Sequence, residues 1–146
     1  MASSDSIQIQ ATEQALRHQF DYAARVNYFV EPRPFQQRVG VAMMEKKNCK
    51  KECRMLCIAG TGSGKSILYQ TLSAIFRGIT IYVSPLLTLG ADQVNKLMVR
   101  TRVIGSTLIP VHLDAVPSPK AMENLLRLLK NTKPNVSVVI FTSPQT

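Results

Sequence analysis

The sequence predicts an α/β fold in which a mostly parallel sheet is covered by helices on both faces. Two observations support this prediction. A glycine-rich segment, Ala59–Ser66, lies between a short apolar run and a helical pattern, and strand-like and helix-like segments alternate along the rest of the chain. Sheets of this kind bind ligands at the carboxyl ends of their strands. The 146 residues are enough for one domain with a hydrophobic core and too few for two.

Two helices are expected before the glycine-rich segment. Residues 1–12 are polar, and apolar residues then recur at helical spacing from Thr12 to about Tyr28. Residues 1–30 are therefore interpreted as an N-terminal helical extension. Two prolines precede a second helical stretch that runs through Val39–Met44.

Strands and helices alternate from the glycine-rich segment onward. Met55–Ile58 is predicted to be a short buried strand, and a helix is expected to begin at Lys65. Gly78 should end this helix, because the β-branched run Ile79–Val83 predicts a strand directly after it. The remaining expected elements are a helix from Leu86 to about Val99, a strand within 106–113, a helix at 120–130 and a strand at 136–141.

The chain is basic, with 18 Lys and Arg against 9 Asp and Glu, a formal net charge of +9. This excess attracts polyanions, so nucleic acid is a plausible partner. Part of the basic excess comes from a cluster of five residues, Lys46, Lys47, Lys50, Lys51 and Arg54. The simpler explanation of this cluster is a solvated loop or helix end. No apolar run approaches the roughly 18–20 residues that cross a bilayer, and Met1–Asp5 does not resemble a signal sequence. An intracellular location is expected, nuclear in a eukaryote.

Three cysteines, Cys49, Cys53 and Cys57, lie close together in the sequence. Their odd number and crowding favour free thiols in a reducing compartment over a disulfide framework. A zinc site is not favoured, because no fourth Cys or His lies close in sequence.

The glycine-rich segment fits the phosphate-binding pattern [Ala/Gly]-x-x-x-x-Gly-Lys-[Ser/Thr]. Backbone N–H groups of Gly62, Ser63 and Gly64 would surround the phosphates of ATP, and Lys65 would reach the β and γ phosphates. The hydroxyl of Ser66 could bind Mg²⁺. Lys65 is the candidate catalytic residue, and the candidate nucleotide-binding residues of the loop are Gly60, Thr61, Gly62, Ser63, Gly64, Lys65 and Ser66.

The acids that ATP hydrolysis requires are not evident. Hydrolysis needs carboxylates that hold the metal and orient water, and these usually lie at the end of another strand. Asp114 follows an apolar run, but no acid follows it, so it is interpreted as a polar residue at a strand end. The last expected strand ends in Thr142-Ser143-Pro144-Gln145, which has no acid. The sequence therefore predicts nucleotide binding without the hydrolytic half of the site.

Four stretches in order resemble the first RecA-like motor domain of superfamily 2 helicases, and most closely that of RecQ-like DNA helicases. They are Arg33–Gln36 for motif 0, Ala59–Ser66 for motif I, Val83–Leu89 for motif Ia, and Phe141–Gln145 for the Ser/Thr-Pro-Glu motif, in which Gln145 replaces the usual acid. The resemblance ends before motif II and before the second motor domain. It implies that residues 31–146 form an incomplete P-loop NTPase domain.

The resemblance also implies functions for individual residues. Gln36 would read the adenine edge, and Tyr28 and Phe29 are weaker candidates for stacking on adenine. A single strand of DNA would be contacted by Ser84, Pro85, Thr142 and Ser143. Without the resemblance, both Ser-Pro pairs would be interpreted as strand ends. The implied protein is an ATP-dependent DNA helicase with 3′-to-5′ polarity that uses ATP and Mg²⁺, and the present chain alone is expected to be inactive.

Two other functions stay open. One is a nucleotide- and nucleic-acid-binding module that does not hydrolyse ATP, such as a truncated paralogue. The other is a small-molecule kinase with the same type of phosphate loop. A kinase of that type is expected to have an arginine-rich lid, and we find no convincing lid in the sequence.

Overall fold

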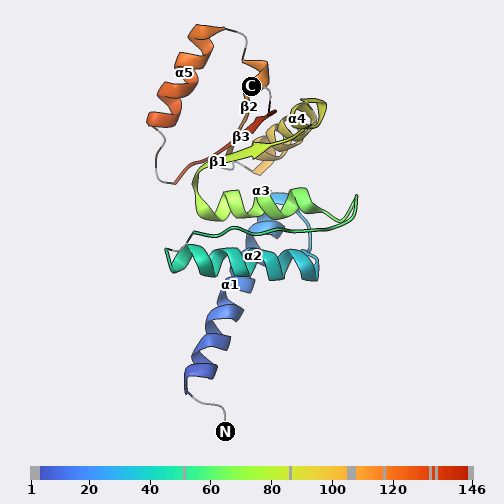
Figure 1. Cartoon of the computed structure of the whole chain (residues 1–146), viewed down its shortest axis with the longest axis vertical. Coiled ribbons are helices and arrows are strands. Elements are labelled where there is room, and N and C mark those ends of the chain that lie inside the picture. The colour runs from blue at the N-terminus through green and yellow to red at the C-terminus, as the bar shows by residue number, and fades with distance from the viewer. Residues whose placement is uncertain are drawn as a thin grey trace. The chain divides into compact units, whose positions relative to one another are not determined.

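The computed structural model describes residues 4–50, 52–85, 87–104, 108–116, 118–131, 133 and 135–144. The chain divides into two compact units, Met1–Ile75 and Phe76–Thr146. Figure 1 shows the helices of the first unit and the sheet of the second.

The first unit is helical and consists of α1 (Ser4–Tyr28), α2 (Pro34–Asn48) and α3, whose span Lys65–Phe76 reaches the division between the units. Buried residues recur every four positions along α1, at Leu16, Phe20, Ala24 and Tyr28. This spacing places them on one face of the helix. The predicted helices are confirmed, and α1 begins at Ser4, earlier than the expected Thr12.

Helices α1 and α2 are joined by a short connection and a close core contact. Arg25 Nε lies 2.7 Å from Glu31 Oε1, and the hydrogen bond and charge of Glu31 raise the pKa of Arg25 above its ordinary value. A Cβ atom added to Gly40 would lie 2.5 Å from Cε2 of Phe20, so the ring packs directly against the backbone of α2. Proline at position 34 starts α2 without losing a hydrogen bond, because the first N–H groups of a helix have no partner within it.

The predicted strand at Met55–Ile58 is wrong. Residues 52–60 have irregular backbone, and the side chains of Leu56 and Ile58 are 84% and 88% exposed. A strand requires a neighbouring strand, and among the described residues none pairs with this segment. The apolar run indicated that the segment could be buried, but periodicity alone cannot supply a pairing partner.

The second unit contains a parallel sheet of three strands in the order β1-β3-β2. Strand β1 spans Gly78–Val83, β2 spans Leu108–His112, and β3 spans Ser137–Thr142. In the register, Ile81 and Val111 both lie opposite Ile140 of the central strand. Strand β3 is buried from Ser137 to Phe141, as expected for an apolar run in the middle of a parallel sheet.

Helices lie on both sides of this sheet. Helix α4 (Leu87–Ile104) packs on the face that includes Phe141 and His112, where Gly90 approaches both side chains. Helix α5 (Pro119–Lys130) lies near Ile109 on the opposite face, across a hollow of about 390 Å³. The predicted α/β class with a parallel sheet flanked by helices is confirmed.

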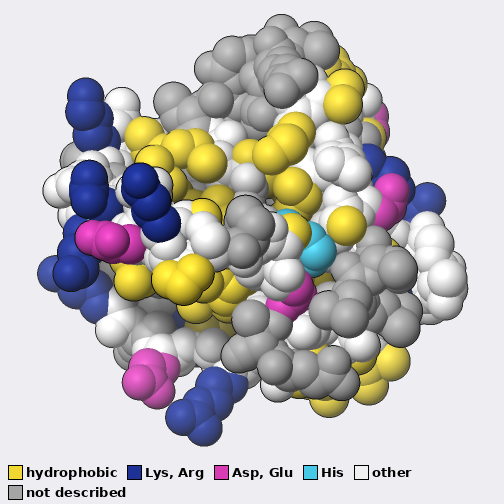
Figure 2. All heavy atoms as spheres, turned by 90° about the horizontal axis from the view of Figure 1, so that it is seen from above, with side chains coloured by type: hydrophobic (Ala, Val, Ile, Leu, Met, Phe, Trp, Pro, Cys, Tyr) yellow, Lys and Arg dark blue, Asp and Glu magenta, His cyan; other side chains and the backbone are white. Residues whose placement is uncertain are grey.

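Pro110 lies within β2, an edge strand of the sheet. The missing N–H of proline is tolerated there, because an edge strand forms ladder hydrogen bonds on one side only. Strand β1 is the other edge strand, and its residues Ile79, Ile81 and Val83 are 50%, 63% and 56% exposed. Figure 2 shows hydrophobic side chains that reach the surface in several places, with Lys and Arg toward the margins of the view.

Candidate functional site

The glycine-rich segment Ala59–Ser66, called the phosphate loop below, ends at the N-terminus of a helix. Gly62 and Gly64 have φ angles of 74° and 89°, the left-handed region that glycine adopts without strain. The loop is closed by a hydrogen bond from Ser63 N–H to the Gly60 carbonyl, at 3.3 Å, and α3 begins at Lys65. The unpaired N–H groups and the dipole of a helix N-terminus favour a bound anion. The predicted helix after the loop is confirmed.

The ammonium group of Lys65 is turned toward its own loop. Its Nζ atom donates to the carbonyl oxygens of Ala59 and Gly60, each at 2.7 Å, and the side chain is exposed. A carbonyl carries only a partial negative charge, whereas a phosphate oxygen carries a formal one, so an arriving phosphate is the stronger partner for this cation.

The loop has room and an unused hydroxyl for a phosphate group. A Cβ atom added to Gly60 or Gly62 would meet no atom within 4 Å, so the space beside these residues is open. The Oγ atom of Ser63 is buried and has no hydrogen-bond partner among the described residues. A buried hydroxyl without a partner costs free energy that a phosphate oxygen would recover.

The residues around the loop fit Mg²⁺ only in part. Ser66 is partly buried in the first turn of α3 and offers one hydroxyl oxygen. In the described part of the chain, no group of three or more His, Cys, Asp or Glu side chains could hold a metal ion. Mg²⁺ is usually bound by few protein ligands together with phosphate oxygens and water, and a single hydroxyl is compatible with that arrangement.

Gln36 and Arg33 contact the phosphate loop directly. The buried side chain of Gln36 accepts a hydrogen bond from Arg33 N–H at 2.6 Å and donates one from Nε2 to the carbonyl of Gly64 at 2.8 Å. The guanidinium of Arg33 donates to the carbonyl of Gly62 at 3.3 Å. The structure thus brings Gln36 to the predicted loop, and Arg33 is an additional contact for which the sequence predicted no function.

The two aromatic candidates differ in accessibility. Tyr28 is 4% exposed, and its hydroxyl donates to the carbonyl of Gln70 at 3.1 Å. Phe29 is 70% exposed and has a φ angle of 54°. Of these two rings, only that of Phe29 is open to a ligand.

The residues expected to contact nucleic acid lie at the carboxyl ends of β1 and β3. Ser84 N–H donates to the carbonyl of Thr142 at 2.9 Å, which joins the two strand ends. Ser84 and Ser143 are only 2% and 6% exposed, whereas Pro85 is exposed and Thr142 is partly buried. The four residues therefore lie together where the strands of the sheet end. Three of them carry hydroxyl groups, and the side chains of two, Ser84 and Ser143, are turned inward. Gln145 lies outside the described residues.

Asp114 and His112 also belong to this edge. Asp114 follows β2 in the short helix η1 (Leu113–Ala115), and its Oδ1 accepts hydrogen bonds from Ser143 N–H at 3.4 Å and Ser143 Oγ at 3.3 Å. His112 Nε2 lies 3.4 Å from Asp114 Oδ2 without hydrogen-bond geometry. Asp114 is a polar residue at a strand end, as predicted. Its contact with Ser143 was not predicted, although parallel strands place their carboxyl ends together.

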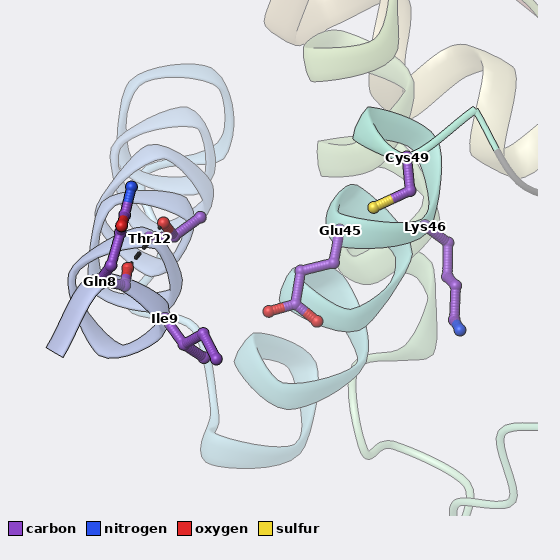
Figure 3. Close-up of a pocket in the computed structure, with 6 residues that line it drawn as sticks. All are labelled: Gln8, Ile9, Thr12, Glu45, Lys46 and Cys49. Atoms are coloured by element: carbon purple, nitrogen blue, oxygen red, sulfur yellow. Dashed lines mark hydrogen bonds between the residues drawn. The ribbon is translucent and has the colours of Figure 1, made fainter. Parts of the chain in front are cut away.

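A hollow of about 360 Å³ lies apart from the phosphate loop, between α1 and α2. It is lined by Gln8, Ile9, Thr12, Glu45, Lys46 and Cys49. In Figure 3, Glu45 and Ile9 face the gap, and Lys46 points away from α1. The hydroxyl of Thr12 donates to the carbonyl of Gln8 at 2.9 Å within α1. The polar groups do not converge on the hollow, so we assign it no function.

The three cysteines are free thiols.

The parallel sheet flanked by helices defines an α/β protein and is consistent with part of a RecA-like domain. The glycine-rich loop at the N-terminus of α3 has the sequence pattern of a phosphate-binding loop. Comparison with known proteins shows partial similarity to RecQ-family ATP-dependent DNA helicases. The resemblance found in the sequence is thereby confirmed.

Three relatives illustrate this similarity. The chain is 54% identical over 41 residues (28% of its length) to the ATP-dependent DNA helicase RecQ of Bacillus subtilis (strain 168). It is 35% identical over 82 residues (56%) to ATP-dependent DNA helicase Q5 of Rattus norvegicus. It is 31% identical over 97 residues (66%) to ATP-dependent DNA helicase Q-like SIM of Arabidopsis thaliana. The chain spans only 7%, 8% and 10% of these relatives. No protein-family model matches the chain.

No helix in the described part of the chain is long and apolar enough to cross a membrane.

Proposed function

We propose that this chain is an ATP-binding portion of a RecQ-like, ATP-dependent DNA helicase and that Mg-ATP binds at Ala59–Ser66. The observation that supports this proposal most is the hydrogen bond from Gln36 to the Gly64 carbonyl, because Gln36 is the residue that resembles the glutamine of motif 0. Relatives described as ATP-dependent DNA helicases share part of this sequence.

The contacts of the loop suggest how each residue takes part in binding. Lys65 leaves the carbonyls of Ala59 and Gly60 and pairs with the β and γ phosphates. The amides of the glycine-rich turn donate to phosphate oxygens, and so does the hydroxyl of Ser63, which has no partner among the described residues. Ser66 supplies an oxygen to Mg²⁺. Gln36 is 3% exposed and is bonded to Arg33 and Gly64, so its side chain would turn outward to present its amide to the adenine edge. The exposed ring of Phe29 is available for stacking.

Single-stranded DNA is the proposed second ligand. The ends of β1 and β3 present Pro85 and Thr142, and the chain carries a net charge of +9. Phosphate contacts of this kind position a strand without reading its bases. The 3′-to-5′ polarity implied by the resemblance belongs to this proposal.

Binding without hydrolysis is a second candidate function for this chain by itself. The 146 residues contain no adjacent Asp-Glu pair. Among the described residues, Asp114 Oδ1 accepts two hydrogen bonds from Ser143. A nucleotide-binding module that does not hydrolyse ATP is consistent with these observations.

The two ligands can be tested separately on the 146-residue chain. A fluorescent ATP analogue with Mg²⁺ should bind saturably, and a labelled oligothymidylate should bind with an affinity that falls as salt is raised, because counterions are released on binding. DNA should not stimulate ATP turnover. Absence of saturable nucleotide binding would contradict the main proposal, whereas DNA-stimulated turnover would contradict the non-hydrolysing alternative.

A further inference from the structure

Asp114 holds the segment that follows β3. Its side chain is 11% exposed, and a single carboxylate oxygen accepts from both the N–H and the hydroxyl of Ser143, at 3.4 Å and 3.3 Å. Burying a carboxylate costs free energy unless hydrogen bonds compensate for the lost water. The two bonds from Ser143 provide such compensation, and in turn they fix Ser143.

His112 and Gly90 restrict the other side of the carboxylate. His112 Nε2 lies 3.4 Å from Asp114 Oδ2. A Cβ atom added to Gly90 would lie 3.1 Å from the same nitrogen, so the imidazole fits closely between α4 and Asp114. This packing limits rotation of the carboxylate and keeps Oδ1 directed toward Ser143.

Thr142 is held from the opposite direction by β1. Its carbonyl accepts the N–H of Ser84 at 2.9 Å, so the backbone of residues 142–143 is held by the end of β1 on one side and by Asp114 of η1 on the other. The hydroxyl of Thr142 donates to the carbonyl of Ser143 at 3.3 Å, and a charged phosphate oxygen would be a stronger acceptor for this hydroxyl. Pro144, the next residue, is exposed.

We propose that Asp114 is a positioning residue for nucleic-acid binding, a role that rests on the proposed function of this edge. It uses both donors of Ser143 to fix the segment 142–144 and thereby presents the Thr142 hydroxyl to a phosphate of the strand. Ser143, one of the residues expected to contact DNA, then acts inside the protein and not on the ligand.

The first measurement is hydrogen exchange at the Ser143 amide, which needs no ligand. Asp114→Ala should accelerate this exchange about tenfold, since the amide loses its acceptor, and Asp114→Asn should restore most of the protection because it keeps an oxygen. Glu123→Ala is the matched control, because it removes an exposed carboxylate of α5 that lies 3.7 Å from Arg127. Circular dichroism establishes that each variant is folded.

The second measurement is affinity for a labelled oligothymidylate. Asp114→Ala should weaken binding about tenfold, with recovery in Asp114→Asn. Ser143→Ala should weaken binding less than Asp114→Ala and should add little in the Asp114→Ala background, because the two residues act through the same bonds. Thr142→Val should weaken binding without changing exchange at Ser143. If Asp114→Ala does not fold, Ser143→Ala tests the same contact, because it removes the hydroxyl that donates to Asp114 Oδ1 and should weaken binding, whereas Asp114→Asn should bind nearly as well as the wild type.

The outcomes separate this inference from the function on which it rests. If hydrogen exchange at the Ser143 amide is unchanged in Asp114→Ala, the proposal that Asp114 fixes residues 142–144 is wrong. If exchange is faster but the affinity for oligothymidylate is unchanged, Asp114 has no role in nucleic-acid binding. A wild-type chain that binds no oligothymidylate overturns the proposed DNA binding at this end of the sheet and with it the positioning role of Asp114, whatever hydrogen exchange shows of the Asp114–Ser143 bonds.

Discussion

The side-chain nitrogen Nε2 of Gln36 lies 2.8 Å from the carbonyl oxygen of Gly64. This bond joins α2 to the phosphate loop across 28 positions of sequence. A Cβ atom at residue 64 would lie 2.6 Å from the same nitrogen, so a side chain there would displace the Gln36 amide. The glutamine and the loop glycine are therefore expected to depend on each other.

Gly64→Ala should destabilise the protein by about 1–3 kcal/mol. The φ angle of 89° strains any residue with a Cβ atom, and the new methyl group would displace the Gln36 amide. Urea unfolding measures the change in the free energy of unfolding. Gly60→Ala is the matched control, because its Cβ atom would meet nothing within 4 Å, and its effect should stay within about 0.5 kcal/mol. Equal effects of the two variants would contradict this explanation.

Lys65→Ala should weaken Mg-ATP binding at least about tenfold, because the phosphates lose their nearest cation. The stability of the folded chain should change little, since the Lys65 side chain is exposed. Isothermal titration of both variants with ATP tests the prediction. Lys96→Ala is the control, because it removes an exposed ammonium that lies 2.6 Å from Asp92 on α4. Unchanged nucleotide affinity in Lys65→Ala would count against the site.

Short sequence patterns correctly predicted the helices and strands whose boundaries depend on residues close by in the sequence. Strand β1 begins at Gly78, which has a φ angle of 80°, and α3 begins where the loop motif ends. The wrong strand at Met55–Ile58 shows the limit of such patterns, because strand formation depends on a partner distant in sequence. The bond between Asp114 and Ser143 joins residues 29 positions apart, and only the parallel register of β2 and β3 brings them together.

Gly40→Ala should destabilise the chain by about 1–3 kcal/mol through overpacking. The added Cβ atom would lie 2.5 Å from Cε2 of Phe20, a fully buried ring that cannot move into solvent. Thermal unfolding of the single variants and of the double variant with Phe20→Leu tests this cause. The smaller side chain should relieve the clash, so the double variant should be less destabilised than the sum of the two single variants. Simple additivity would show that the ring is not the source of the strain.

Ser118 starts α5, and its hydroxyl accepts a hydrogen bond from Ala121 N–H at 3.3 Å. Ser118→Ala should cost about 0.5–2 kcal/mol of helix stability, whereas Ser118→Asp should retain the cap and add a favourable charge at the helix N-terminus. None of the α5 residues that the structure describes is buried, so this helix has little packing to hold it once the cap is lost. The loss should therefore appear as faster hydrogen exchange at residues 120–123 with little change at β3. Equally faster exchange in β3 would show that α5 unfolds together with the sheet and not independently.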